Sequence, residues 1–390
     1  MIRLFVAHLL AGADLHLETN KILTIEGKTI TSILPGTADS ADVVLPSSVT
    51  LLPGLIDCHS HLALDARIPG HLDMMDDAES VQTLRALRAI KDDLYHGITG
   101  LRCMGDRYYL DIVLRDSATC EDIIAPWMQV SGIGMKGIHG HGYVGRAFSG
   151  VEEFRKQARE NLHHGVDWLK IFVTSGTPSE HIDWYLSREE IRAVIDEAYS
   201  CGIKTSAHCI GGQGLQYCVE EGISVLDHCY WVDEHNIELI MKSNSTVCFT
   251  PGIFMDDLRL PMCPAAHVEK VKYYRAEVEK RLSRLVAAKP RFVVGSDANH
   301  GLLWKDVNYM VQLGMSEKEA IKGVTVYAAH LMERKTGQLT SGYDADMIAV
   351  DDNPLKNVAC LEHVRFVCKG GRIIRCDFST TSSDRCAGEI

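Results

Sequence analysis

Short apolar runs alternate with longer amphipathic segments through the middle of this chain. Eight runs of about four to eight residues have the length and the aliphatic composition of buried strands. Segments with apolar residues at helical spacing separate most of them. A strand followed by a helix, repeated eight times, is typical of a (β/α)8 barrel. The predicted strands cover residues 51–57, 98–103, 127–131, 166–173, 203–207, 223–227, 246–250 and 291–296.

The helical segments carry recognisable start signals and apolar stripes. One predicted helix has a stripe formed by Val81, Leu84, Leu87 and Leu94. The pattern Ser-x-x-Glu at residues 187–190 is that of a capping box, and it predicts a helix start. The same pattern at residues 316–319 predicts one further helix that extends to about residue 331.

The two ends of the chain have a different pattern. Residues 1–50 and 338–390 contain short alternating strands separated by turns. We expect these two pieces to pair into one small β-sandwich beside the barrel, which then occupies residues 51–337. The predicted fold class is therefore α/β, a (β/α)8 TIM barrel with a small β-sandwich built from both chain ends.

Composition is that of an ordinary globular protein and limits the partners. The chain has 390 residues, of which 46% are hydrophobic and 24% are charged, so it can bury a large core. A net charge of −12 without a basic stripe argues against nucleic acid. No apolar run has the form of a signal peptide or the length of a membrane span. We expect a small-molecule substrate and a homo-oligomer, with neither nucleic acid nor a membrane as partner.

The thirteen cysteines do not have the spacing of a disulfide framework, because their number is odd and no Cys-x-x-Cys occurs. Adjacent residues on a strand face opposite ways. Cys58, Cys209 and Cys229 each adjoin a histidine considered below, so we expect their thiols to lie under the helices as small apolar groups. Reduced thiols indicate an intracellular protein, and we expect it in the cytoplasm.

Residues that can bind a metal stand at the ends of several predicted strands. His59 and His61 are two apart, so on a strand their side chains share a face. The segment between His208 and His228 has the length of one helix, so these histidines end two consecutive strands. Strand ends meet at the catalytic face of a barrel. The candidate metal ligands are His59, His61, Lys170, His208, His228 and Asp297.

Lys170 is the unusual member of this set, because an ammonium group cannot bind a cation. Apolar neighbours lower the pKa of a lysine by desolvation, and a neutral amine can add CO2. The resulting carbamate is an anionic ligand that can bridge two ions. With Asp297 and a hydroxide it offsets most of the charge of two divalent ions. The predicted cofactors are two divalent metal ions, with Zn2+ expected, and a CO2-derived carbamate on Lys170.

The order His-x-His, Lys, His, His, Asp resembles the amidohydrolase superfamily, in its form with a binuclear centre and a carboxylated lysine. Residues 52–62 are similar to the first-strand motif of that family, and residues 336–355 to its return segment. Residues 165–171 and 228–230 resemble most closely the branch of Xaa-Pro dipeptidase-like and N-acyl-amino-acid carboxypeptidases. The resemblance covers nearly the whole chain and implies a hydrolase that acts on amide bonds.

Two further residues are candidates for substrate binding. His141 lies in a glycine-rich loop, residues 132–142, and resembles the substrate-contacting histidine of the dipeptidase-like branch. Tyr230 follows the sixth predicted strand, where its phenol can face the same cavity. Arg107 and Arg188 are alternatives for holding a substrate carboxylate, and the sequence does not choose between them.

The predicted function is metal-dependent hydrolysis of an amide or peptide bond in a small substrate, such as a dipeptide or an N-acyl amino acid. A hydroxide that bridges the metals attacks, while Asp297 is the catalytic residue that accepts a proton and returns it to the leaving nitrogen. Hydrolysis of a cyclic amide needs the same six ligands and is the alternative. Deamination ranks lower, because Cys209 rather than a glutamate follows His208. A scaffold without catalysis predicts losses among the six ligands, and all six are present.

Overall fold

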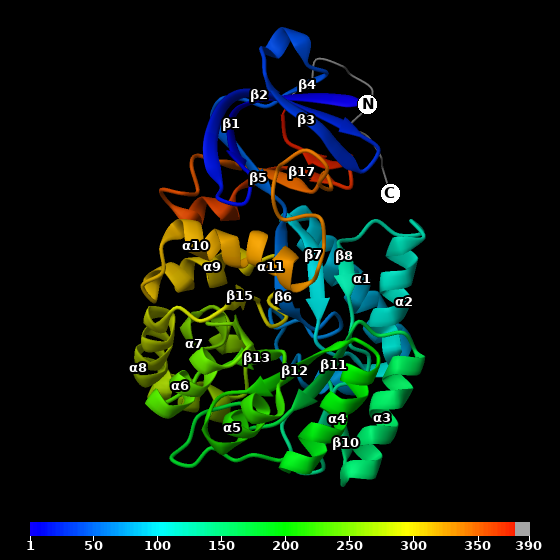
Figure 1. Cartoon of the computed structure of the whole chain (residues 1–390), viewed down its shortest axis with the longest axis vertical. Coiled ribbons are helices and arrows are strands. Elements are labelled where there is room, and N and C mark those ends of the chain that lie inside the picture. The colour runs from blue at the N-terminus through cyan, green and yellow to red at the C-terminus, as the bar shows by residue number, and fades with distance from the viewer. Residues whose placement is uncertain (379–390) are drawn as a thin grey trace.

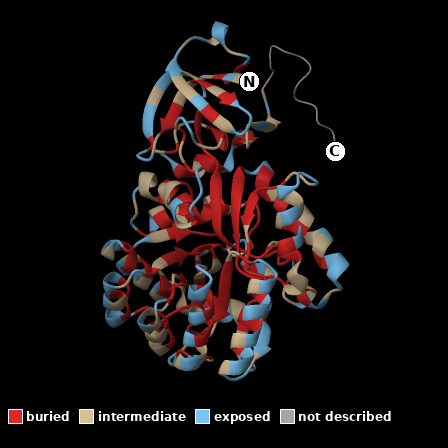
Figure 2. Cartoon of the chain, turned by 45° about the vertical axis from the view of Figure 1, so that its right-hand side comes forward, coloured by how far each residue is buried: buried red, intermediate tan, exposed pale blue. Residues whose placement is uncertain are grey.

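The structure, a computed structural model, describes residues 1–378 of the chain. Figure 1 shows two parts along its long axis: a small one made of strands from both chain ends, and a larger α/β part below it. In Figure 2 the buried residues run through the strands at the centre of the larger part, while the surrounding helices expose their outer faces. The core that positions any site therefore lies around the central strands.

The larger part is a barrel of eight parallel strands, paired within the sets β6-β7-β8 and β11-β12-β13-β14-β15. Backbone hydrogen bonds join these two sets on both sides. The N–H groups of Asp167 and Trp168 donate to the Val130 carbonyl, after β8. The N–H of Asp297 donates to the His59 carbonyl at 2.8 Å. The predicted (β/α)8 barrel is therefore confirmed. Its strands are β6 (Leu55–Ser60), β7 (Ile98–Cys103), β8 (Trp127–Gln129), β11 (Trp168–Phe172), β12 (Lys204–Cys209), β13 (Val225–His228), β14 (Thr246–Phe249) and β15 (Phe292–Val294), and the short β9 (Met135–Gly137) and β10 (Arg146–Phe148) extend the second set.

The first predicted strand, residues 51–57, is divided between two sheets. Residues Val49–Pro53 form β5 outside the barrel, and Leu55–Ser60 form β6 within it. Gly54 lies between them, where a Cβ atom would stand 2.3 Å from Thr99 Oγ1. Only a residue without a side chain allows this close passage, so one apolar run changes sheets at the glycine.

Helices cover the outside of the barrel (Figure 1). α4 begins at the predicted capping box, in which Ser187 and Glu190 each accept a hydrogen bond from the backbone N–H of the other. The stripe predicted for α1 was wrong at its start: Leu94 is buried, but Val81 and Leu84 are exposed. The buried face begins at Gln82 and continues through Ala86, Ala89 and Ile90. The helices are α1 (Glu79–Tyr95), α2 (Leu110–Thr119), α3 (Val151–His163), α4 (Arg188–Ser200), α5 (Gly212–Glu221), α6 (Glu234–Lys242), α7 (Gly252–Met255), α8 (Ala265–Ala288) and α9 (Leu303–Gln312), followed by α10 (Glu317–Gly323) and α11 (Val326–Leu331) in place of one predicted helix.

The smaller part is built on one mixed sheet of order β18-β17-β16-β5-β1-β2-β3, with β4 paired to β1. Leu23 and Ile25 on β2 share a hydrophobic core with Met347 on β16 and Phe366 on β17. Because β2 is not a neighbour of β16 or β17 in the sheet, the sheet folds over its own core. The strands outside the barrel are β1 (Ile2–Ala11), β2 (His16–Glu26), β3 (Thr29–Pro35), β4 (Val43–Val44), β5, β16 (Met347–Asp351), β17 (Val364–Lys369) and β18 (Arg372–Cys376).

The cysteines among residues 1–378 are free thiols. Cys209 and Cys229 pack in the main core with Cys218 of α5, as expected. Cys58 instead packs in a second cluster with Trp168 of β11 and with residues of β13, β14 and β15. These strands lie around the barrel from β6, so the Cys58 thiol faces the barrel interior, and the prediction of an outward direction was wrong for this residue.

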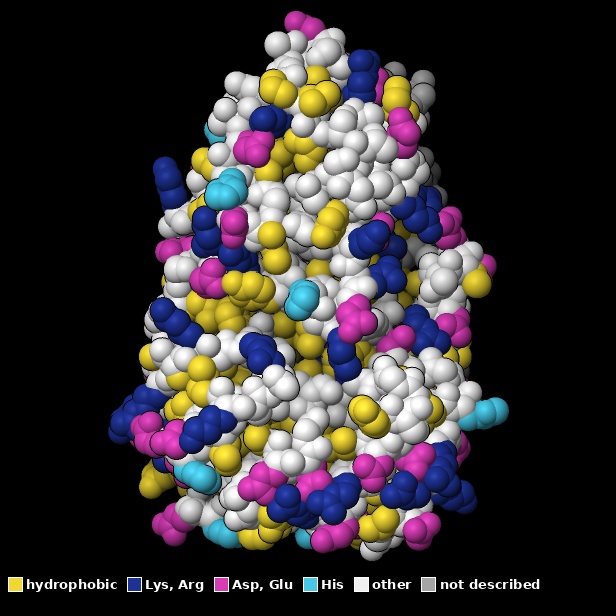
Figure 3. All heavy atoms as spheres, in the orientation of Figure 1, with side chains coloured by type: hydrophobic (Ala, Val, Ile, Leu, Met, Phe, Trp, Pro, Cys, Tyr) yellow, Lys and Arg dark blue, Asp and Glu magenta, His cyan; other side chains and the backbone are white. Residues whose placement is uncertain are grey.

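The sequence also led to expectations about membrane spans, surface charge and domain limits. Within residues 1–378, no helix is both long enough and apolar enough to cross a membrane. On the face shown in Figure 3, basic and acidic side chains are interspersed. The domain limits, 1–50 with 338–390 and 51–337, stay a prediction, and residues 379–390 lie outside the described part of the chain.

Candidate active site

The carboxyl ends of the barrel strands surround a cavity of about 370 Å³. His59 of β6 and His61 just after it line this cavity, together with His208 at the end of β12 and His228 at the end of β13. Asp297, which follows β15, completes this group. Five of the six predicted ligand side chains therefore meet on one wall of the cavity, which we call the ligand wall.

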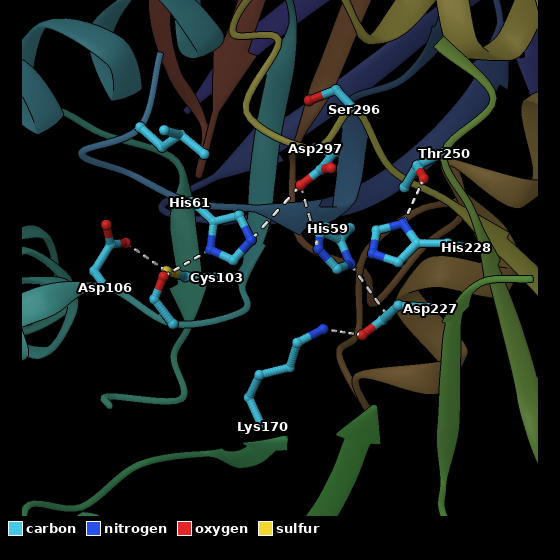
Figure 4. A network of polar contacts seen from close by, with 12 residues as sticks. His59, His61, Cys103, Asp106, Lys170, Asp227, His228, Thr250, Ser296 and Asp297 are labelled. Atoms are coloured by element: carbon cyan, nitrogen blue, oxygen red, sulfur yellow. Dashed lines mark hydrogen bonds and ion pairs between the residues drawn. The ribbon is translucent and has the colours of Figure 1, made fainter. Parts of the chain in front are cut away.

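His59, His61 and Asp297 form the tightest group on the ligand wall (Figure 4). Nε2 of His59 lies 3.5 Å from Asp297 Oδ1, and Nε2 of His61 lies 3.6 Å from the same oxygen. One ligand atom from each of the three residues lies within 4.8 Å of the other two. The His228 ring is centred 4.8 Å from that of His59 and 4.5 Å from that of His208. Protein ligands bind zinc at about 2 Å, so donors at this spacing can surround a small metal centre.

The outer nitrogen atoms of two imidazoles are held by backbone carbonyls. His61 Nδ1 lies 2.7 Å from the carbonyl oxygen of Gly105, and His208 Nε2 lies 3.2 Å from that of Ser175. A carbonyl can only accept, so these nitrogens carry the proton and the opposite nitrogens keep their lone pairs. A metal-binding histidine is usually oriented in this way. The residues on the ligand wall thus fit a metal centre.

Burial keeps the imidazoles of the ligand wall neutral. It lowers the pKa of His61 to about 4, and it also lowers the pKa values of His59, His208 and His228. Burial alone would raise the pKa of Asp297, but positive charge on its basic neighbours, which are His59 and His61 when protonated and Arg259, holds that pKa below its ordinary value. The wall therefore offers neutral imidazoles and one carboxylate at neutral pH, which are the forms that bind metal.

The backbone is strained where two of these ligands lie. His228 has φ of 81° and Asp297 has φ of 52°, in the left-handed region that non-glycine residues avoid. Such conformations persist only where surrounding contacts impose them. Near Asp297, the buried carboxylate of Asp57 accepts from Ser296 Oγ at 2.5 Å and from the His59 N–H at 3.0 Å. Asp57 therefore ties the ends of β6 and β15 together beneath the ligand wall.

Lys170, the sixth predicted ligand, does not line the cavity and lies buried beneath it on β11. Its ammonium nitrogen contacts Asp227 (Figure 4). The same carboxylate lies 2.9 Å from an Arg102 nitrogen, 3.1 Å from His59 Nδ1, and accepts from Ser206 Oγ at 2.7 Å. Burial lowers the pKa of Lys170, which favours the neutral amine. Its carboxylation and its role as a ligand stay predictions.

Asp227 is a residue that sequence reasoning missed. The sequence pattern marks Asp227 only as the last residue of a predicted strand, directly before the candidate ligand His228. The signal was an acid inside one apolar run, and a second signal was Arg102 inside another. Opposite charges within two buried strands can be satisfied by pairing with each other.

The two predicted substrate-binding residues lie at the same cavity. His141 lines it, with its ring centred 4.6 Å from that of His208, and burial lowers the pKa of His141 to about 4. The Tyr230 hydroxyl donates to the Thr250 carbonyl at 3.1 Å and lies 3.0 Å from His228 Nδ1. Their contact with a substrate stays a prediction.

Another wall of the cavity carries nitrogen bases that the sequence did not single out. We call it the basic wall, and it consists of His71, Arg259, His267 and Lys270. The arginines proposed from the sequence lie elsewhere, outside the cavity lining: Arg107 is 2.6 Å from Asp76, and Arg188 is 2.8 Å from Glu220. Arg259 lies in an irregular segment between α7 and α8, where no strand end marked it.

Comparison with known proteins supports this description. The model of a family described as the amidohydrolase family matches residues 50–375. Ochratoxinase of Aspergillus niger is 25% identical over 379 residues, covering 83% of this chain and 75% of the relative. A crystal structure of a Xaa-Pro dipeptidase with bound methionine is 23% identical, with a TM-score of 0.83 over 96% of this chain and 99% of its own. A prolidase complexed with N-methylphosphonate-L-proline is 20% identical, with a TM-score of 0.85 over 96% and 100%. At these identities, the likeness to the two solved structures shows the fold.

Proposed function

Because this chain belongs to the amidohydrolase family, we propose that it hydrolyses an amide or peptide bond in a small substrate that carries a free carboxylate. Dipeptides and N-acyl amino acids are the substrate class we favour. The observation that carries this proposal is the ligand wall, where four neutral imidazoles and one carboxylate meet at a single cavity.

Two divalent ions, with zinc expected, are the proposed cofactors. His59, His61, His208, His228 and Asp297 would hold them, and Lys170 would join as a carbamate after adding CO2. When bound, the ions would lower the pKa of a water molecule and polarise the scissile carbonyl. The lowered pKa of the buried Lys170 supports its part, since CO2 adds to the neutral amine.

Asp297 is the proposed general base and general acid. Its pKa lies below the ordinary value, so the carboxylate is ionised at neutral pH and can accept a proton from the attacking water. The same carboxyl group then donates that proton to the leaving nitrogen. Its backbone strain and its hydrogen bond to the His59 carbonyl fix its direction toward the cavity.

His141 and Tyr230 are the proposed donors to the substrate. A neutral His141 can donate one hydrogen bond, and the Tyr230 hydroxyl can turn from Thr250 toward a ligand. Two similar structures support a substrate with a free carboxylate. One is a dipeptidase with bound methionine, and the other is a prolidase complexed with N-methylphosphonate-L-proline.

The test is a substrate screen of the zinc-loaded protein with dipeptides, N-acyl amino acids, cyclic amides and amino-purines. We expect turnover of the first two classes and loss of at least a thousandfold in kcat for Asp297→Asn, which keeps the shape but cannot accept the proton. Turnover of cyclic amides alone would replace the proposal by cyclic-amide hydrolysis. Ammonia release from amino-purines alone would replace it by deamination.

A further inference from the structure

The cavity is unevenly charged. Among the described residues that line it, Asp297 is the single acid, and it faces the imidazoles of the ligand wall. The basic wall has two cationic side chains, Arg259 and Lys270. Burial and the charge of Arg259 lower the pKa values of His71 and His267, so these two imidazoles are neutral at pH 7. The basic wall therefore carries an excess of positive charge.

Arg259 is a cation that forms no salt bridge within the described part of the protein, although its charge helps to lower the pKa of Asp297, the acid of the same cavity. Its Nη1 atom is buried and has no hydrogen-bond partner within residues 1–378. The two acids nearest to it in the chain are engaged elsewhere. Asp256 accepts from Lys305 at 2.8 Å, and Asp257 accepts from Arg275 at 2.6 Å.

The neighbouring thiol does not neutralise this cation. Cys263 donates to the Arg259 carbonyl at 3.6 Å, and burial raises the pKa of the thiol, so it stays uncharged. A buried donor without an acceptor destabilises the folded protein, and more so when it is charged. This cost is recovered if a ligand in the cavity supplies the acceptor.

We propose that Arg259 binds a carboxylate of the substrate and thereby selects anionic substrates, while the scissile amide lies at the ligand wall. The proposal rests on the proposed function and adds to it a residue that determines specificity. A guanidinium group presents paired N–H donors that match the two oxygens of a carboxylate. The expected source is the α-carboxylate of the leaving amino acid, and an acidic side chain would offer the same group.

The experiment uses the zinc-loaded full chain and a panel of N-acetyl-L-amino acids, each paired with its C-terminal carboxamide. The panel includes the glutamate and glutamine derivatives, which separate an acidic side chain from the α-carboxylate. Arg259→Met removes the charge, and Arg259→Lys keeps it without the paired donors. Lys272→Met is the matched control, because it removes an exposed cation of α8 that does not line the cavity.

We expect Arg259→Met to lower kcat/KM for the carboxylates on the order of a hundredfold, since a charged partner is lost. The carboxamides should change less than about threefold, and Arg259→Lys should recover part of the loss. Added guanidinium ion should partly restore Arg259→Met. If the carboxamide of the glutamate derivative is preferred over that of the glutamine derivative, the proposal is supported, and the acidic side chain is the carboxylate that Arg259 binds. An equal loss for carboxylates and carboxamides, or none, overturns it.

A binding measurement separates this inference from the proposed function. Free L-amino acids and their amides are tested for their effect on the Tm of the zinc-loaded protein. If the wild type hydrolyses nothing in the panel, the proposed function fails, and binding alone decides on Arg259. Stabilisation of the wild type by free amino acids, but not by their amides, and its loss in Arg259→Met support the inference. Equal stabilisation of wild type and variant, or no stabilisation of either, overturns it.

Discussion

The ligand wall and the basic wall face the same cavity but are built in different ways. The ligand wall stands on the ends of buried strands. Hydrogen bonds to backbone carbonyls orient His61 and His208, and the Asp227 carboxylate lies 3.1 Å from His59 Nδ1. The basic wall stands on α8 and on irregular segments, and it includes a buried guanidinium nitrogen without an acceptor within residues 1–378. Each imidazole of the ligand wall has a polar neighbour in the protein, whereas Arg259 on the basic wall forms no salt bridge among the described residues.

This difference separates two tasks of a hydrolase. Groups that hold metal and move protons must be preorganised, because misplacement by about 1 Å costs catalysis. Groups that select a substrate can be left unsatisfied, because an analogue without the matching group then leaves them unpaired and is rejected. Variants on and beneath the two walls test whether the protein divides its work in this way.

The largest effect is expected at Lys170, beneath the ligand wall. Lys170→Ala should lower kcat on the order of a thousandfold and reduce the metal content from about two ions to one or fewer, because the bridging carbamate is lost. Lys170→Arg should not restore activity, since a guanidinium stays protonated and cannot add CO2. Elemental analysis and steady-state kinetics check both.

Lys204→Ala serves as the control for this series, because Lys204 begins β12 at the opposite end of the barrel and pairs with Glu333. Its metal content should equal that of the wild type. A fully active Lys170→Arg protein with two bound ions would show that the lysine is purely structural.

Asp227 is expected to give the largest effect on stability. Asp227→Ala leaves Arg102 and Lys170 buried without their carboxylate, which should lower the free energy of unfolding by about 3–5 kcal/mol. Asp257→Ala, near the basic wall, removes an exposed carboxylate from its pair with the partly buried Arg275 and should cost about 1 kcal/mol. Urea unfolding of the metal-free proteins measures both. Equal losses would mean that the buried cluster is not held by its charges.

The two walls also differ in how far the sequence could predict them. His59, His61, His208, His228 and Asp297 were predictable because each stands where an apolar run ends, and parallel strands end at one face. The barrel followed from the same alternation of apolar runs and helices.

The rest depends on contacts between distant segments. Asp227 and Arg102 are 125 positions apart, so their pairing inside the barrel left no local pattern. Arg259 lies in a segment without strand or helix periodicity. It stands out only because its buried Nη1 atom has no acceptor within residues 1–378, which a sequence pattern does not show. The division of residues 51–57 at Gly54 depends on the close approach of Thr99.

The ligand wall should respond to pH through His61. Its pKa is about 4 in the folded protein and near 6.5 when unfolded, so between these values the unfolded chain binds more protons. The stability that the neutral imidazole contributes is fully present above pH 6.5 and is lost as the pH falls through 4, a loss on the order of 3 kcal/mol. Urea unfolding of the metal-free protein between pH 4 and 8 measures it.

His61→Gln keeps a donor to the Gly105 carbonyl but cannot titrate. It should therefore show a shallower fall between pH 6.5 and 4 and the same slope as the wild type above pH 7. Identical slopes over the whole range would mean that the buried His61 is protonated as readily in the folded chain as in the unfolded one.

The smallest effect is expected at Tyr230, which could serve either the metal ligands or substrate selection. Its hydroxyl donates a hydrogen bond to the Thr250 carbonyl and lies beside His228 Nδ1. A substrate carboxylate must therefore compete with these groups for the hydroxyl. Tyr230→Phe should therefore lower kcat/KM for free carboxylates by about tenfold, the value of one hydrogen bond of about 1.4 kcal/mol. Carboxamides should lose less. The same kinetic comparison distinguishes the two walls. An equal loss for carboxylates and carboxamides would show that the hydroxyl acts on His228 of the ligand wall. Arg259 and His141 would then select the carboxylate.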